Sequence, residues 1–335
     1  MKPAQLHPSP EPSPRTLVHA FARRRVLVVG DFVADHYIYG QTERVSREAP
    51  VLVVRYEQSE VKLGGGANVA ANLAALGARV EAVGVLGGDE MGRALRAAFR
   101  SARIRVRTPS ARGLTTETKT RILAGGLHTS RQQMLRLDRT VQGPLPPRVR
   151  ASLASLVRAA ARDVDAVVVS DYGAGVLGEE TRGVLRALAA EGMPVCVDSR
   201  YALGAYRGFT VCKPNEPELL ALTGIEVRDA SSLEAAMRRA SKVLGCRALV
   251  ATRGRHGMAI FEGRTLTLLP VHGAEEAVDV TGAGDTVIAA LALGLAAGGT
   301  VLDAARLANV AGGKVVMKPG TATVTAAELL GELAA

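Results

Sequence analysis

A short polar turn that leads into an apolar helix constrains this chain more than any other stretch. Residues 279–285 read Asp-Val-Thr-Gly-Ala-Gly-Asp, and residues 286–293 continue as an apolar, alanine-rich run. The first N–H groups of a helix lack intrahelical partners, and the helix dipole makes that end favourable for an anion such as phosphate. Asp285 could then accept a proton from a hydroxyl that attacks the phosphate. The same residues also fit a glycine turn capped by an aspartate, so other parts of the chain must decide.

The composition indicates a globular protein that binds an anion. The chain has 335 residues, enough for one large domain or two ordinary ones, and carries a net charge of +10. Nucleic acid is one candidate anion, but no basic stretch is interleaved with aromatic residues as a single-strand binder requires. Small phosphorylated ligands explain the basic excess equally well. The three cysteines are far apart in the sequence, which favours a reducing compartment over a disulfide framework.

Neither the N-terminus nor the apolar segments predict a membrane protein. Residues 1–20 are proline-rich and contain no apolar run, so we expect a disordered tail and not a secretory signal. The longest apolar stretch, Val287–Leu302, is short and interrupted by glycine, which predicts a buried helix and its continuation. The expected location is therefore the cytoplasm, with no membrane partner.

Strand and helix patterns alternate along most of the chain. The first strand ends in a turn at Gly30-Asp31, and Asp35 follows shortly after it. Repeated strand–helix units predict a doubly wound parallel sheet, whose strand ends and polar loops share one edge. The expected strands are Arg25–Asp31, Val80–Leu86, Ala166–Ser170, Pro194–Asp198, Phe209–Cys212 and Ala248–Ala251, and the helices are Glu90–Ser101, Arg148–Ala161, Glu179–Ala190, Glu216–Thr223 and Leu233–Leu244.

Two segments lack the helices that this alternation requires. Residues 40–62 and 115–139 contain strand-like runs with no crossover helix between them. We interpret them as a small antiparallel β flap, or lid, beside the main sheet. The alternative is that they are edge strands of the main sheet.

A second glycine-rich turn opens a helix at Leu63–Gly77, with Asn68 near its start. That turn alone also fits a tight turn followed by a packing helix. Neither a dinucleotide-binding Gly-x-Gly-x-x-Gly after the first strand nor a Walker A sequence occurs, which argues against Rossmann dehydrogenases and P-loop enzymes.

The combination of these motifs resembles the ribokinase-like sugar kinases of the phosphofructokinase-B type. The motifs are Gly-Asp at the end of the first strand, Gly-Gly-x-x-Asn on a helix, Asn-x-x-Glu at 215–218 and the turn at 279–285. The resemblance implies a three-layer αβα sandwich over residues 21–335. Residues 42–51, 132–138 and 170–172 are further similar to the kinase domains that phosphorylate D-glycero-β-D-manno-heptose 7-phosphate at carbon 1. The resemblance thus implies ATP, Mg²⁺ and a phosphorylated sugar as ligands. It also implies a role in the biosynthesis of ADP-heptose, a precursor of lipopolysaccharide.

The resemblance also implies roles for individual residues. Asp285 would be the catalytic base, and Asn215 and Glu218 would hold Mg²⁺, through waters. A monovalent cation near Asp279 and Gly320 is further implied. Separately from the resemblance, the open edges of the lid strands could be covered by a second subunit, so we expect a homodimer formed through the lid. The transferred phosphoryl would be stabilised by N–H groups of Gly282, Ala283 and Gly284. The nucleotide would contact Lys213, Asn215, Thr252, Gly254, Gly257 and Asn309. The sugar and its phosphate would contact Asp35, Gly64, Gly65, Asn68, Arg44, Lys119, Arg121, Arg136 and Asp171.

Other functions remain open at this stage. The acceptor could be fructose, a fructose phosphate or ribose, because those kinases share the core motifs. Departures from the heptose kinases bear on this choice, such as Ala174 in place of a lysine and a longer flap hairpin around residues 125–131. More remote alternatives are a sugar- or nucleotide-sensing protein without catalysis and a nucleic-acid binder.

Overall fold

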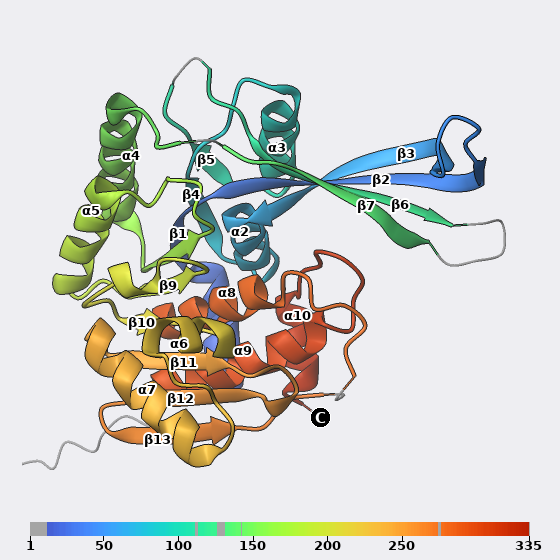
Figure 1. Cartoon of the computed structure of the whole chain (residues 1–335). Coiled ribbons are helices and arrows are strands. Elements are labelled where there is room, and N and C mark those ends of the chain that lie inside the picture. Colours follow the sequence, from blue (N-terminus) through green and yellow to red (C-terminus); the bar gives the residue numbers. More distant parts are fainter. Residues whose placement is uncertain (1–11, 111–112, 126–130, 142, 274–275, 335) are drawn as a thin grey trace, which may run out of the picture.

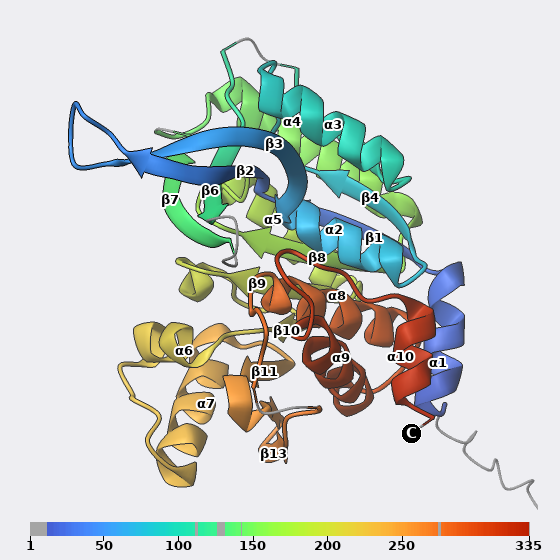
Figure 2. The same ribbon diagram turned by 90° about the vertical axis from the view of Figure 1, so that its right-hand side faces the viewer.

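The computed structural model describes residues 12–110, 113–125, 131–141, 143–273 and 276–334. Within these ranges, a nine-stranded sheet is covered by helices, and a four-stranded sheet extends away from it as a lid (Figures 1 and 2). This confirms the predicted α/β class. The longer flap hairpin expected at residues 125–131 lies mostly outside the described residues.

The large sheet is mainly parallel. Its strand order is β13-β12-β11-β10-β9-β8-β1-β4-β5, and only β12 and β13 run antiparallel to their neighbours. Its described strands are β1 (Arg25–Gly30), β4 (Arg79–Val83), β5 (Arg105–Arg107), β8 (Ala166–Asp171), β9 (Val195–Ser199), β10 (Val211–Cys212), β11 (Ala248–Thr252), β12 (Met258–Glu262) and β13 (Thr265–Leu269).

Side chains of the central strands point alternately to the two faces of the sheet and pack into two separate cores. On β1, Val26 and Val28 pack into the core on one face, while Leu27 and Val29 pack into the core on the other. All four are fully buried, as expected for a strand between two helical layers. The first face is covered by α1 (Pro14–Ala20), α2 (Gly66–Ala75), α3 (Glu90–Ser101), α8 (Ala283–Ala296), α9 (Val301–Val315) and α10 (Ala326–Glu332). The second is covered by α4 (Pro147–Ala160), α5 (Glu179–Ala190), α6 (Glu216–Thr223) and α7 (Ala230–Leu244).

The lid consists of β2 (Phe32–Val45), β3 (Leu52–Gly65), β6 (Glu117–Gly125) and β7 (Gln132–Arg139). Its order is β3-β2-β6-β7, with antiparallel outer pairs and a parallel central pair, β2 and β6. These strands pair with one another, so they are not edge strands of the main sheet. The lid begins earlier than the predicted residue 40, because β2 starts one residue after Asp31 and carries the chain directly out of β1. Asp35 therefore lies on the lid.

Two regions differ from the sequence-based expectation. Residues 14–20, assigned to a disordered tail, form α1, because Ser13 caps a helix that begins with Pro14 and buries Leu17 and Val18. Residues 1–11 of that tail lie outside the described part of the chain. The apolar stretch Val287–Leu302 is divided between α8 and α9, which pack on each other. Within the described ranges, none of the helices combines the length and apolar character that a bilayer crossing requires.

Candidate active site

The site lies where the carboxyl ends of the parallel strands meet the first turn of α8, as expected for an open α/β sheet. Gly282 caps α8 with a φ of 79°, a left-handed conformation that favours glycine. A Cβ atom at this position would lie only 2.7 Å from Nδ2 of Asn68. The N–H group of Ala283 donates to the carbonyl of Val280 at 3.2 Å. The predicted turn is therefore present, and one of its three N–H groups is engaged within it.

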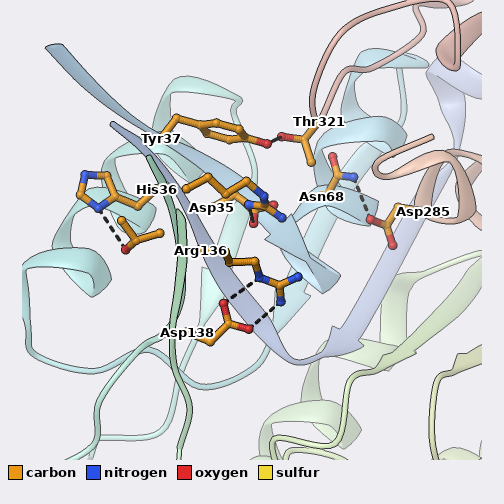
Figure 3. Close-up of polar contacts among 10 residues, drawn as sticks. Asp35, His36, Tyr37, Asn68, Arg136, Asp138, Asp285 and Thr321 are labelled. Carbon is orange, nitrogen blue, oxygen red and sulfur yellow. Dashed lines mark hydrogen bonds and ion pairs between the residues drawn. The ribbon is translucent and has the colours of Figure 1, made fainter. Parts of the chain in front are cut away.

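Asp285, in the first turn of α8, is buried and held by two side chains. Asn68 donates from Nδ2 to Oδ2 at 2.8 Å (Figure 3), and the Tyr172 hydroxyl donates to Oδ1 at 3.1 Å. Burial raises the pKa of Asp285 to about 7, with the charge of Asp198 adding to the shift and the two hydrogen bonds opposing it. Such a carboxylate is poised to exchange a proton near neutral pH.

A buried chain of hydrogen bonds fixes the orientation of the Asn68 amide. The Thr286 hydroxyl donates to Oδ1 of Asn72 at 2.7 Å, and Asn72 donates from Nδ2 to Oδ1 of Asn68 at 3.2 Å. Because the oxygen of Asn68 is engaged by Asn72, its NH₂ group faces Asp285. Asn72 and Thr286 are fully buried, so their hydrogen bond is a second polar contact between α2 and α8, beside that of Asn68 and Asp285.

The loop that carries Tyr172 is anchored by Asp31. The carboxylate of Asp31 accepts N–H bonds from Tyr172 at 2.8 Å, Ala174 at 3.0 Å and Val176 at 3.3 Å. Burial outweighs these bonds and raises the pKa of Asp31 to about 6. The negative charge of Asp285 raises the pKa of Tyr172 well above its ordinary value, so the phenol keeps the proton that it donates. Asp31, which follows β1, therefore holds in place the loop whose Tyr172 donates the second hydrogen bond to Asp285.

The lid contributes a buried ion pair beside this network. Arg121 on β6 contacts Asp35 on β2 at 2.6 Å. A Cβ atom on Gly64 would lie 2.5 Å from Oδ2 of Asp35, and one on Gly65 would lie 2.7 Å from the carbonyl of Asp31. Gly64 thus permits the close approach of β3 to the Asp35 carboxylate, and Gly65 permits its approach to the backbone of Asp31. Asp35, Gly64 and Asn68 are brought to one place, as predicted, but Arg121 is paired with Asp35.

The residues predicted to bind metal and phosphate lie around α6. Lys213 is buried and contacts Asp198 at 3.0 Å. Although burial would lower the pKa of Lys213, the charge of Asp198 raises it, so the ammonium persists. Asn215 caps α6, with Oδ1 accepting from the N–H of Glu218 at 2.8 Å, and Glu218 accepts the Asn215 N–H at 3.0 Å. The motif is thus a capping box that also presents oxygen atoms. In the described residues, no group of three or more His, Cys, Asp or Glu side chains forms a metal cluster.

A cavity of about 240 Å³ lies on one side of the α8 N-terminus. It is largely apolar in its lining, through residues such as Met258, Val271 and Val287. The predicted nucleotide contacts Thr252, Gly254, Gly257 and Asn309 all line it, together with Ala283 and Gly284. The Asn309 amide donates to the carbonyl of Pro270 at 2.7 Å. The structure therefore brings these four residues together, next to the turn that carries Asp285.

A second cavity, of about 260 Å³, lies between the lid and the main sheet. Lys119 and Arg136 line it from the lid, and Tyr172 lines it from the loop after β8. Arg136 forms a bidentate pair with Asp138 at 2.8 and 2.5 Å (Figure 3). Because Tyr172 also contacts Asp285, this cavity and the catalytic turn share a wall.

Three predicted positions have other surroundings. Arg44 is exposed near the far end of β2, away from both cavities. Asp171 accepts hydrogen bonds from Ser199 at 2.9 Å and Tyr206 at 2.7 Å, so its carboxylate holds the sheet edge together. Asp279 accepts N–H bonds from Thr281 and Gly320, both at 2.8 Å, which closes the loop predicted to bind a monovalent cation.

Sequence reasoning did not assign a role to four residues that the structure places at the site. Asn72 follows Asn68 by one helical turn, and that spacing could have suggested a shared face. Asp198 lies at the end of β9 and Arg200 follows that strand, at the sheet edge predicted to be active, and this position was a usable signal. Tyr172 lies in a loop whose path depends on Asp31, and no local pattern reveals that contact.

Comparison with known proteins agrees with this geometry. The model of the pfkB family of carbohydrate kinases matches residues 23–327. The bifunctional protein HldE of Geobacter sulfurreducens is 43% identical over 316 residues, which cover 92% of this chain and 62% of that protein. HldE of Trichlorobacter lovleyi is 40% identical over 311 residues, covering 91% of this chain and 62% of the relative. The chain thus spans less than two thirds of the length of these curated relatives.

Solved structures share the fold at low sequence identity. Phosphofructokinase-2 from Escherichia coli in complex with fructose-6-phosphate has a TM-score of 0.73 at 19% identity, over 93% of this chain and 98% of that chain. Ribokinase from Arabidopsis thaliana, complexed with ribose and ATP, has a TM-score of 0.70 at 20% identity, over 92% and 98% of the two chains. These similarities confirm the ribokinase-like fold.

Proposed function

The chain belongs to the pfkB family of carbohydrate kinases, and we propose that it transfers the γ-phosphate of ATP to the C1 hydroxyl of D-glycero-β-D-manno-heptose 7-phosphate. The product is the 1,7-bisphosphate, a precursor of ADP-heptose. One observation carries the proposal: Asp285 lies against residues of both cavities, since Gly284 lines the first and Tyr172 the second. The identity to HldE supports the choice of heptose.

In the proposed reaction, Asp285 accepts the proton of the sugar hydroxyl as its oxygen bonds to the γ-phosphorus. The bond between that phosphorus and the β,γ-bridging oxygen breaks, and ADP leaves. Asn68 and Tyr172 hold the carboxylate in place, and the N-terminus of α8 stabilises the charge on the transferred group. Lys213 adds a buried positive charge near the carboxylate.

Asp35, Gly64 and Asn68 would contact the sugar ring, and Thr252, Gly254, Gly257 and Asn309 would contact the nucleotide. Mg²⁺ prefers oxygen ligands, and Asn215 and Glu218 present such atoms beside Lys213. They would hold the ion through water, where it would neutralise phosphate charge.

Activity on a panel of acceptors tests the proposal. The purified chain is assayed for ADP release with heptose 7-phosphate, fructose 6-phosphate, fructose and ribose, and the product is identified by phosphorus NMR. We expect the highest kcat/KM with heptose 7-phosphate and a new phosphate on C1. Equal or higher values with another acceptor would replace the heptose assignment, and no turnover with any sugar would refute the kinase function.

We further propose that two copies pair through their lids. Apolar side chains are exposed on three of the lid strands, where a second copy could cover them. They are Val45 on β2, Leu52 and Tyr56 on β3, and Met134, Leu135 and Leu137 on β7. Sedimentation velocity should give a dimer that Leu135→Lys and Leu137→Lys weaken. A monomer at assay concentrations would contradict this arrangement.

A further inference from the structure

A loop that follows α9 lies between the lid and the turn at residues 279–285. The hydroxyl oxygen of Tyr37, on the lid strand β2, lies 3.5 Å from Oγ1 of Thr321 in this loop (Figure 3). A Cβ atom on Gly320 would lie 3.9 Å from the same Tyr37 oxygen and 3.8 Å from Nζ of Lys62, on β3. Two strands of the lid therefore face the loop.

The same loop is attached to the turn that precedes α8. The carboxylate of Asp279 accepts the N–H groups of Gly320 and Thr281, both at 2.8 Å. A Cβ atom on Gly282 would lie 3.6 Å from the Cγ2 methyl of Thr321, so this methyl lies against the N-cap of α8. Thr321 thus directs its hydroxyl to the lid and its methyl to the turn, and a movement of one is passed to the other.

Tyr37 is held firmly within the lid. It is only 6% exposed, and its ring centre lies 5.3 Å from the guanidinium carbon of Arg121 and 5.2 Å from Nζ of Lys62. Arg121 in turn pairs with Asp35 at 2.6 Å. Asp35 and Tyr37 are two positions apart on β2, so their side chains leave the same face of the strand. The carboxylate assigned to the sugar and the hydroxyl that faces Thr321 therefore move together.

The distance between the two hydroxyls makes their contact sensitive to the position of the lid. Hydrogen bonds between hydroxyl groups usually span about 2.5–3.0 Å and weaken as the distance grows. Because the Tyr37 and Thr321 oxygens are 3.5 Å apart, a small movement of the lid toward the loop strengthens the contact, and a small movement away breaks it.

We propose that Tyr37 and Thr321 are positioning residues for phosphoryl transfer. The hydrogen bond between their hydroxyls joins the lid, which holds the sugar, to the turn that carries Asp285. It therefore sets the distance between the acceptor hydroxyl and the base. This inference rests on the proposed function, in which Asp35 contacts the sugar and Asp285 takes its proton. Both hydroxyls act on the rate through geometry, since a displacement of about 1 Å at the reacting groups can cost up to about 10²-fold in rate.

Removal of either hydroxyl tests this arrangement. We compare Tyr37→Phe, Thr321→Val and the double variant with the wild type, and Thr321→Ser keeps the hydroxyl. Tyr39→Phe is the matched control, because Tyr39 lies on the same strand and its hydroxyl donates to Glu60 within the lid at 2.6 Å. The measured quantities are kcat and both KM values, with the sugar that the wild type phosphorylates best, and the release of ADP without sugar.

We expect Tyr37→Phe and Thr321→Val each to lower kcat for the sugar about 3- to 10-fold, with KM for ATP unchanged. The double variant should be no slower than the slower single variant, because both substitutions remove the same hydrogen bond. Thr321→Ser should keep most of the wild-type kcat, and Tyr39→Phe all of it. ADP release without sugar should be unchanged, since attack by water does not depend on where the lid holds a sugar.

Three results would overturn the proposal: an unchanged kcat in both single variants, losses that multiply in the double variant, or an equal fall of ADP release with and without sugar. The last would mean that the hydroxyls only stabilise the turn. If the wild type phosphorylates none of the sugars, the proposed function fails and this inference fails with it. Wild-type turnover that the variants leave unaffected keeps the proposed function and removes only the role of Tyr37 and Thr321.

Discussion

Asn68 on α2 donates a hydrogen bond to Asp285 on α8 across 2.8 Å, although the two residues lie 217 positions apart in the sequence. The contact places the first turn of α8, which carries Asp285, against the glycine-rich turn between β3 and α2. It also gives Asp285 a neutral donor that stabilises the ionised carboxylate. The two glycine turns recognised in the sequence therefore form a single site.

Asp285→Asn tests the base directly. The substitution keeps the size of the side chain but removes its ability to accept a proton, so we expect kcat to fall by about 10²–10⁴-fold while ATP binding is retained. Steady-state kinetics and ATP titration measure the two effects. Asp163→Asn, at an exposed position, is the control. Turnover close to that of the wild type would refute the assignment.

The raised pKa of Asp285 predicts how activity depends on pH. The base must be ionised, so kcat/KM should fall about tenfold per pH unit below a pH of about 7. A profile that stays flat down to pH 5, measured with an acceptor whose own ionisation is corrected for, would contradict this role.

The raised pKa of Asp285 makes the folded chain less stable as pH rises, whereas activity increases with pH. A carboxyl group with a raised pKa binds its proton more tightly in the folded chain, so its contribution is complete below pH 3.8 and is lost as pH rises through about 7. Asp31, with a pKa of about 6, acts in the same direction. Asp285→Asn should therefore gain stability over the wild type at pH 8, by on the order of 1–4 kcal/mol, and by roughly a third of that at pH 5, which lies between the two pKa values. Urea unfolding at both pH values measures this difference, and an equal difference at both would argue against a buried charge.

Thr286→Val tests the hydrogen-bond chain behind Asn68. Without the Thr286 hydroxyl, Asn72 loses the contact that fixes its amide, and Asn68 is freer to turn its oxygen toward Asp285. We expect kcat to fall about tenfold and the acid limb of the pH profile to move upward. Thr223→Val is a matched control, because Thr223 is also buried on a helix and donates to the carbonyl of Leu219. Both variants should lose about 1 kcal/mol of stability, and a pH profile that moves in neither variant would reduce Thr286 to a structural role.

Gly282→Ala separates backbone strain from displacement of Asn68. Any Cβ atom in this left-handed conformation costs about 1–2 kcal/mol, and here it would also meet the Asn68 amide at 2.7 Å. Gly298→Ala has a similar φ of 92° with open space around it, so it isolates the strain. Unfolding experiments should show a loss of stability in both variants, whereas only Gly282→Ala should lose kcat. Equal activity of the two would show that the tight contact is dispensable.

The sequence predicts those parts of the site that depend on local patterns. The turn at Asp285, the helix start at Asn68 and the capping residues Asn215 and Glu218 are each encoded within a few positions. That Arg200 lines the same cavity as Lys119 and Arg136 depends instead on where the lid strands lie relative to the end of β9, which local patterns do not specify.

Other discrepancies have similar causes. Asp171 belongs to a recognisable motif, but its role depends on Tyr206, a partner 35 residues away. The helix α1 was obscured by the prolines around it, although Ser13 and Pro14 together form a helix start. The difference at Asp171 therefore comes from a long-range contact that local patterns do not encode. The start of α1, in contrast, was predictable from the local pair Ser13 and Pro14.

Glu218→Gln tests the metal role apart from the cap of α6. Glutamine can maintain the capping box, so the helix should remain formed, but the charge that would attract Mg²⁺ is lost. We expect the Mg²⁺ concentration for half-maximal activity to rise about tenfold, with a smaller change in unfolding free energy. Glu328→Gln is the matched control, because Glu328 occupies the same position in the capping box of α10. If both variants respond to Mg²⁺ as the wild type does, Glu218 serves only as a cap, and the ion is held by other groups at this edge of the sheet.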